Sequence, residues 1–182
     1  MEIRRGLWKT CRVIASEPRL QLLWYLFAEE ELTVTTCCQL TGLSPSNTSF
    51  QLKMLCECGL LVFRRKKMEV FYRAEANSAV NFAPEVLEAL RGCYENEVAF
   101  KTLVRHATAF THERRIEIFR ALSGRSLTGL ALRDATGMSS AAMGRHLDKL
   151  MRRGYVTEKE HSYYIGAAGN LLGRTLLKLA VR

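Results

Sequence analysis

The amino-acid sequence predicts a mainly α-helical fold with small β-hairpins, in which one unit occurs twice along the chain. This prediction rests on an internal repeat and on the order of helix, turn and strand signals inside it. Residues 42–61 read GLSPSNTSFQLKMLCECGLL and residues 137–156 read GMSSAAMGRHLDKLMRRGYV, with small, leucine and glycine positions matching at a shift of 95. A repeat of this length indicates a duplicated domain rather than a solenoid unit.

The repeat extends on both sides of these segments. Upstream, residues 18–26 resemble residues 114–122, and downstream, residues 71–77 resemble residues 164–170. The shift changes there to 96 and 93, and such slips are expected in loops. We therefore predict a first domain at residues 1–83, a linking segment at 84–107 and a second domain at 108–182.

The composition is that of a soluble globular chain with an excess of positive charge. Its 182 residues carry 27 lysines and arginines against 18 aspartates and glutamates, a formal net charge of +9. A basic chain of this size favours a polyanionic partner, most simply nucleic acid. No apolar run approaches the roughly 20 residues of a membrane helix, and the N-terminus lacks the pattern of a signal peptide. We expect a cytoplasmic protein without a membrane partner.

Each half begins with an amphipathic helix and a shorter helix, and a Gly-X-Ser turn follows. Apolar residues at helical spacing predict the first helix at 19–27 and 114–122 and the shorter one at 35–41 and 129–136. The turn serines, Ser44 and Ser139, are good N-caps for a further helix at 46–58 and 141–153. Gly59 and Gly154 follow that helix, where glycine is favoured.

Two β-prone runs come after each of these helices. They read LLVFRR with EVFYRA and YVTE with SYYIG, and a charged or polar turn joins each pair as in a hairpin. Two helices joined by a short glycine-containing turn and followed by a hairpin make a winged helix-turn-helix. The predicted fold class is therefore mainly α with small β-hairpin wings, in tandem winged helix-turn-helix domains.

Residues 84–107 should join the two domains as one long helix. Apolar residues at 86, 87, 90, 93, 94, 98, 103 and 104 form a helical stripe, and Pro84 suits a first turn. Gly92 is the point at which such a helix would break. The C-terminal NLLGRTLLKLAVR looks like a shorter relative of this segment.

The pattern LTVTTCCQLTGLSPSNTSFQLKMLCECGLL resembles the helix-turn-helix of ArsR-type (arsenic-repressor-like) winged-helix regulators. ASEPRLQLLWYL resembles the first core helix of that family, and the second half is similar through SSAAMGRHLDKLMRRGYV. The resemblance implies that the second helix of each motif enters the major groove of double-stranded DNA and that the hairpin, or wing, follows the backbone. Most members of the family carry one such domain and dimerise, whereas this chain carries two copies of the pattern.

The two predicted recognition helices should each turn one face to the core and one to DNA. Spacings of four and three place the trio Thr48, Leu52 and Leu55, and the trio Met143, Leu147 and Leu150, on inward faces. The candidate DNA contacts of the first helix are Ser44, Ser46, Asn47, Ser49, Phe50, Gln51 and Lys53. Those of the second are Ser139, Ser140, Ala141, Ala142, Arg145, His146 and Lys149.

The residue types suit DNA chemistry. Asn47 and Gln51 can bond base edges and Arg145 can pair with guanine, while the serines and lysines suit phosphates. The first wing adds the basic run Arg64, Arg65, Lys66 and Lys67 ahead of Tyr72, and the second adds Lys159 and His161 beside two glutamates. Phe50 stands where the family usually has a polar or basic residue, so the two halves should read different half-sites.

Two quaternary arrangements stay open. One chain can act as a pseudo-dimer that presents two recognition helices about one DNA turn, roughly 34 Å, apart, with segment 84–107 as the shared interface. Alternatively, two chains form a homodimer with four modules.

The six cysteines have a structural and a sensory interpretation. Most lie inside apolar patterns and read as small core residues. The metal-sensing motif of the family puts two cysteines one residue apart, at positions equivalent to Thr33 and Thr35, so it is not carried over. A thiol site that combines Cys56 with Cys37 or Cys38 is the alternative, and we expect no other metal site and no cofactor.

Three functions compete at this point. A DNA-binding transcription regulator accounts for the repeat, the basic charge and the polar outward faces. A tandem winged-helix module that binds proteins is the alternative, because Phe50, Ala141 and Ala142 are apolar for a DNA face. An enzyme is not expected, since neither a phosphate-binding glycine loop nor a nucleophile, histidine and acid set stands out.

Overall fold

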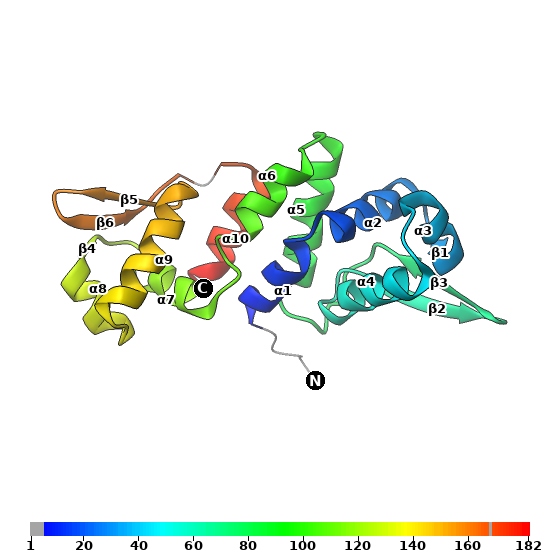
Figure 1. Ribbon diagram of the computed structural model, residues 1–182, viewed down its shortest axis with the longest axis horizontal. Coiled ribbons are helices and arrows are strands. Elements are labelled where there is room, and N and C mark those ends of the chain that lie inside the picture. Colours follow the sequence, from blue (N-terminus) through cyan, green and yellow to red (C-terminus); the bar gives the residue numbers. More distant parts are fainter. Residues whose placement is uncertain (1–5, 168) are drawn as a thin grey trace.

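The computed structural model describes residues 6–167 and 169–182, and its elements fall into two halves with the same order (Figure 1). The first half contains α1 (Leu7–Ile14), α2 (Glu17–Ala28), β1 (Leu32–Thr33), α3 (Val34–Thr41), α4 (Pro45–Glu57), β2 (Val62–Lys66), β3 (Glu69–Arg73) and α5 (Ala83–Glu95). The second contains α6 (Phe100–Ala107), α7 (Glu113–Ala121), β4 (Leu127–Thr128), α8 (Gly129–Thr136), α9 (Ser140–Arg152), β5 (Val156–Lys159), β6 (Ser162–Ile165) and α10 (Leu171–Ala180).

The fold is mainly helical with two small antiparallel sheets, as the sequence predicts. The sheets have the strand orders β1-β3-β2 and β4-β6-β5, so each predicted hairpin has gained a third strand. The added strands are only two residues long, and they pair Leu32 with Tyr72 and Leu127 with Tyr163. A strand of two residues has no measurable alternation of apolar and polar positions, which is why the sequence pattern missed it.

Hydrogen-bonded caps fix the turn between the paired helices. Thr33 and Ser44 cap α3 and α4 with their side-chain oxygens, and Thr128 and Ser139 cap α8 and α9 in the same way. Gly42 ends α3 with a φ of 69°, a left-handed conformation that glycine adopts without steric cost. These caps confirm the predicted turns and set the helix starts within a residue of the expected positions.

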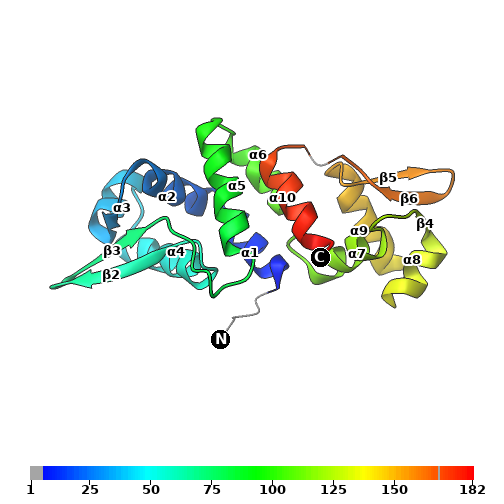
Figure 2. The ribbon, with the colours of Figure 1, turned by 180° about the vertical axis from the view of Figure 1, so that it is seen from behind.

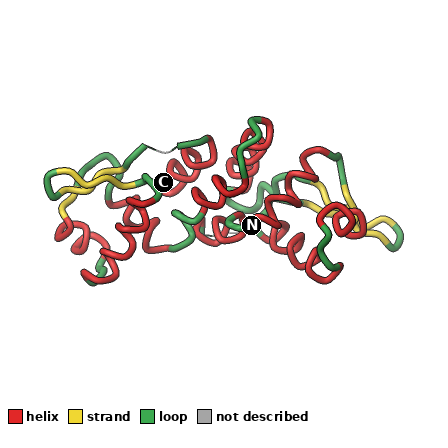
Figure 3. The backbone as a smooth tube through the Cα atoms, turned by 45° about the horizontal axis from the view of Figure 1, so that its top comes forward, coloured by secondary structure: helices red, strands yellow, loops and turns green. Residues whose placement is uncertain are grey.

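The middle of the molecule is a layer of four helices. In Figure 2, α5 and α10 lie side by side at the front, and α1 and α6 lie behind them. The paired helices bury Val86, Leu90 and Cys93 from α5 and Leu172 and Leu176 from α10. Figure 3 shows that the strands lie at the two ends of the elongated molecule, with helices between them. The halves therefore share one hydrophobic core.

The prediction of one long helix at 84–107 is wrong. Helix α5 ends at Glu95 and α6 begins at Phe100, and the chain turns between them. The turn forms because the backbone N–H of Val98 donates to the carbonyl of Cys93 at 2.9 Å and Glu97 adopts a left-handed φ of 52°. This pattern is the hydrogen bonding of a Schellman helix end.

Gly92 is not the break that the sequence suggested. It stays inside α5, where a side chain would clash, since a Cβ at this position would lie 2.5 Å from Leu171 Cδ2 of α10. The absence of a side chain thus serves the packing of α5 against α10 rather than a bend.

An arginine at the same place in each half ties two helices together. Arg19, in α2, donates from Nε to the carbonyl of Val13 and from Nη2 to that of Arg12. Arg115, in α7, donates in the same way to Ala109 and Thr108, six and seven residues upstream. Each guanidinium therefore satisfies carbonyls of the segment that precedes its helix.

No helix in the described part of the chain combines the length and apolar character needed to cross a bilayer.

Replacing Arg115 should destabilise the fold, because the side chain is only 5% exposed and holds three acceptors. Arg115→Met leaves buried carbonyls without a donor, which should lower the free energy of unfolding by about 2 kcal/mol. Urea denaturation measures the change. The control is Arg120→Met, at an exposed arginine of the same helix, which should change stability by less than about 0.5 kcal/mol. Equal stability of both variants would show that the buried guanidinium is not a net stabiliser.

Candidate nucleic-acid interface

Helix α4 presents the predicted polar face to solvent. Its inward residues, Thr48, Leu52 and Leu55, are fully buried, which confirms the predicted orientation of the helix. The exposed residues are Ser46, Asn47, Ser49, Phe50 and Lys53, and the ring of Phe50 is 56% exposed. Ser44 is exposed at the N-cap, where its Oγ accepts from the N–H of Asn47. The first-half candidates on this helix thus share one open surface, with the exception of Gln51.

Gln51 is half-buried and already bonded. Its Oε1 accepts from Nη1 of Arg19 at 2.8 Å, and its Nε2 donates to Oδ1 of Asn47 at 2.8 Å. The chain of hydrogen bonds from Arg19 to Asn47 fixes the rotamers of both predicted base-reading side chains. Asn47 is exposed and accepts through Oδ1 alone in these bonds, whereas both polar atoms of Gln51 are engaged. Sequence spacing did not indicate this role of Arg19, since the two residues are 32 positions apart.

The first wing carries exposed basic residues at its outer end. Arg65, Lys66 and Lys67 are exposed, and Met68 at the tip is 100% exposed. Arg64 is exposed as well, but its Nε donates to Glu31 at 2.8 Å and its guanidinium lies 5.0 Å from the Phe71 ring centroid. The ion pair lowers the pKa of Glu31 and partly neutralises Arg64. The positive charge that stays unpaired is therefore at the tip of the hairpin.

Tyr72 is a packing residue in this structure. It is half-buried against the core, its ring lies 6.1 Å from that of Phe63, and it pairs with Leu32 across the sheet. Burial raises the pKa of its hydroxyl. Tyr72 therefore packs partly against the core, and its role as a DNA contact stays a prediction.

Helix α9 repeats the geometry with different chemistry. Met143, Leu147 and Leu150 are buried as predicted. Ser139, Ser140, Ala141 and Arg145 are exposed, while Ala142, His146 and Lys149 are half-buried. Burial, with Arg115 and Arg153 close by, lowers the pKa of Lys149. Arg145 is the most open cation among the predicted contacts of this helix.

The second wing offers less free charge than the first. Nζ of Lys159 lies 3.6 Å from a carboxylate oxygen of Glu160, and His161 is exposed at the tip. Glu160 and His161 both have left-handed backbones, with φ of 52° and 59°, as a tight hairpin turn requires. Any electrostatic attraction to a polyanion should therefore be stronger at the first wing.

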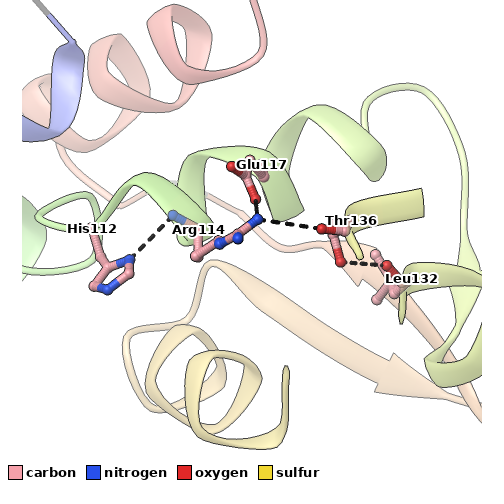
Figure 4. A network of polar contacts seen from close by, with 5 residues as sticks. All are labelled: His112, Arg114, Glu117, Leu132 and Thr136. Atoms are coloured by element: carbon pink, nitrogen blue, oxygen red, sulfur yellow. Dashed lines mark hydrogen bonds and ion pairs between the residues drawn. The ribbon is translucent and has the colours of Figure 1, made fainter. Parts of the chain in front are cut away.

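Two histidines have structural partners that the sequence did not indicate. His112 caps α7, where its Nδ1 accepts from the N–H of Arg114 at 3.1 Å (Figure 4). Its ring lies 4.6 Å from that of His146. Nδ1 of His106 lies 2.6 Å from the hydroxyl of buried Tyr155. His106 is half-buried, and this contact joins α6 to the residue that precedes β5.

Arg114 connects α7 to the short helix before the turn. Its Nη1 donates to Glu117 at 2.8 Å and to the carbonyl of Thr136 at 3.4 Å, and the Thr136 hydroxyl donates to Leu132 (Figure 4). Because Thr136 is the last residue of α8, these contacts hold the turn that precedes α9.

The cysteines have the character of core residues. Cys37 and Cys58 are buried, and the thiol of Cys58 donates to the carbonyl of Leu55 at 3.4 Å. Burial raises the pKa of the Cys37 and Cys56 thiols to about 11 in each case, which disfavours the thiolate that binds metals and reacts. Among the described residues, no three His, Cys, Asp or Glu side chains gather where they would share a metal ion.

Acid should destabilise the protein through the His112–His146 pair. Burial and nearby arginines lower the pKa of both rings. The unfolded chain, with ordinary values near about 6.5, therefore takes up protons that the folded chain does not. The free energy of unfolding should fall as the pH drops below about 6.5.

His146→Gln tests this prediction, because glutamine is the residue at the matching position of the first half, Gln51. Urea denaturation of the variant should show a smaller loss of stability between pH 7.5 and 5.5 than the wild type. His161→Gln removes an exposed histidine and should keep the wild-type slope. An unchanged slope in His146→Gln would mean that the pair does not titrate in this range.

The first half also has a sequence match. The sequence model described as "Bacterial regulatory protein, arsR family", a helix-turn-helix, matches residues 16–61, which run from the N-cap of α2 through α4 to the residue before β2. None of the curated proteins compared with the chain matches it. The segment from Ser16 to Leu61 is thus similar to the helix-turn-helix of arsR-family bacterial regulators.

Proposed function

We propose that this protein is a sequence-specific DNA-binding transcription regulator without catalytic activity. In this proposal α4 and α9 enter the major groove, and the two wings contact the phosphate backbone. The observation that carries the proposal is the joint placement of the two helices. Both lie on the face turned toward the viewer in Figure 1, away from the pair α5 and α10 at the front of Figure 2.

The arsR-family match at residues 16–61 supports this role for the first half. Exposed Asn47 on α4 and exposed Arg145 on α9 have the donors that base edges accept. Lys53, Arg65, Lys66 and Lys67 add exposed positive charge around the first helix. A net charge of +9 agrees with a polyanionic partner.

We further propose that one chain acts as a pseudo-dimer. The contacts between α5 and α10 and between α1 and α6 join equivalent helices of the two halves, as a two-fold dimer interface would. One copy of the chain would then cover two half-sites about one DNA turn, roughly 34 Å, apart. Since α4 carries Asn47 and Phe50 where α9 carries Ala142 and Arg145, the half-sites should differ.

A protein-binding role is the second candidate, and exposed apolar side chains favour it. Phe50 and Phe63 are each 56% exposed, and Met68 is fully exposed.

A DNA titration distinguishes the two candidate functions. Fragments of the native genome are titrated with the protein, and the association constant should fall steeply with salt, with a slope of about −0.9 per contacted phosphate. Binding to one protein partner and to no fragment would favour the interaction module instead.

Arg145→Ala should weaken binding to the selected fragment by about 5- to 150-fold and relax the preference at one base pair, because a good arginine–guanine pair is worth about 1–3 kcal/mol. Fluorescence anisotropy with single-base variants of the fragment measures both effects. The matched control is Lys178→Ala, which removes an exposed charge from α10 on the opposite face. If both variants bind like the wild type, α9 does not read the groove.

The double variant Lys66→Ala, Lys67→Ala should weaken binding equally for all sequences and reduce the salt slope by about 2, one for each lost phosphate contact. Lys159→Ala should change the slope less, because Lys159 is close to Glu160. The same slope for wild type and double variant would place the first wing away from the phosphates.

The length of DNA that the protein protects and the number of chains bound per duplex distinguish the two quaternary arrangements. A pseudo-dimer protects one pair of half-sites and binds with one chain per duplex. A doubled footprint with two chains per duplex would identify a homodimer.

A further inference from the structure

A hollow lined by aromatic and acidic side chains lies where α5 turns into α6. Its volume is about 510 Å³, and its wall includes Trp24, Tyr94, Glu95, Glu97, Val98 and Phe100. These residues come from α2, from the end of α5 and from the start of α6. None of them belongs to the surfaces of α4, α9 or the wings.

The rings form a cluster around this hollow. The Trp24 ring stands edge-on to Tyr94 at 5.7 Å between centroids and to Phe100 at 5.2 Å. All three side chains are half-buried, so each retains some open surface. Large aromatic rings at a solvent-accessible wall attract cations through their negative π faces. The chain already places one cation on this cluster, because the Arg91 guanidinium lies 4.5 Å from the ring centroid of Phe27, which contacts Trp24.

The charge at the rim has the complementary sign. Glu95 and Glu97 are exposed and line the hollow, and within the described chain neither forms an ion pair. The two carboxylates give the hollow a negative rim, although the chain as a whole has a net charge of +9. The combination attracts a positive group with an apolar body and repels an anion.

The fold itself does not require aromatic residues here. In the internal repeat, Trp24 matches Arg120, which lies in α7, and Phe27 matches Ser123, which lies just after α7. The equivalent helix therefore forms without an aromatic residue at either position. The aromatic cluster is therefore specific to the first half, whereas the helix that carries Trp24 occurs in both.

Glu97 holds a backbone position that glycine would occupy with less strain. Its φ of 52° is left-handed, in the position of a helix end where glycine is the usual residue. The chain thus has a carboxylate at the rim of the hollow, at a position where glycine would be less strained. Glu160 has the same φ of 52° and is also exposed, but it lies at the tip of the second wing.

We propose that the hollow is a binding site for a small organic cation with an apolar body, such as a quaternary ammonium compound or a protonated aromatic amine. The rings of Trp24, Tyr94 and Phe100 contact the apolar body and the cationic centre, and Glu95 and Glu97 supply the opposite charge. The site is separate from the proposed DNA surface, and it is tested on the chain without DNA.

The test uses three probes that share a benzene ring and differ in charge: benzyltrimethylammonium, benzyl alcohol and benzoate. Trp8 and Trp24 are the two tryptophans of the sequence, so a Trp8→Phe background leaves Trp24 as the reporter. Benzyltrimethylammonium should change Trp24 fluorescence with saturation, benzyl alcohol should bind more weakly, and benzoate should not bind. Equal affinity for the cation and the alcohol, or no saturable change with the cation, would overturn the proposal.

Two matched variants separate the site from general effects of charge and strain. Glu97→Gly should weaken the binding of benzyltrimethylammonium by at least about threefold, as expected for the loss of a nearby opposite charge. It should also raise the midpoint of thermal unfolding, because the backbone strain is relieved. Glu160→Gly removes the same charge and the same strain at the wing and should bind the probe like the wild type. If Glu97→Gly also binds the cation like the wild type, the hollow is not the site.

Discussion

The arrangement of the whole molecule depends on the burial of the apolar faces of α5 and α10 against each other. Ala89 and Cys93 of α5 and Leu172 and Leu176 of α10 are buried, and the two helices are in contact. Gly92 permits the close approach, since a Cβ there would meet Leu171 of α10 at 2.5 Å. Gly173 of α10 makes room for a different neighbour, because a Cβ there would meet the hydroxyl of Tyr155 at 2.5 Å. Since α5 ends the first half and α10 the second, this contact sets how far apart α4 and α9 lie.

The same scaffold supports different chemistry in the two halves. An arginine at equivalent places, Arg19 or Arg115, ties each core helix to the segment before it. In the first half this arginine also holds Gln51, whereas at the matching place in the second half His146 packs against His112. One side chain is fixed by charged hydrogen bonds and the other by ring packing, so the two surfaces should differ in their response to pH and in the sequence they read.

Local patterns predicted a large part of the fold. The caps at Ser44 and Ser139, the inward trios of α4 and α9 and both hairpins follow from residues close together in the chain, and all are present. The contacts that these patterns missed involve distant partners. Tyr72 is half-buried and pairs with Leu32 of β1, and Nδ1 of His106 bonds to the hydroxyl of Tyr155, 49 residues later. The break after α5 escaped detection because Glu97, not a glycine, takes the left-handed position.

The sequence by itself determined the elements, their order and their repetition, because helical periodicity, caps and turn residues act over a few positions. It also determined the basic charge and the residue types on the outward faces of α4 and α9. Only the tertiary structure decided which of these side chains are open and which are held, as Gln51 is by Arg19. It alone brought Trp24, Tyr94 and Phe100 to one hollow. The physical reason is that burial and hydrogen bonding depend on contacts between helices, and a sequence pattern does not specify which residue of a distant helix will meet a given side chain.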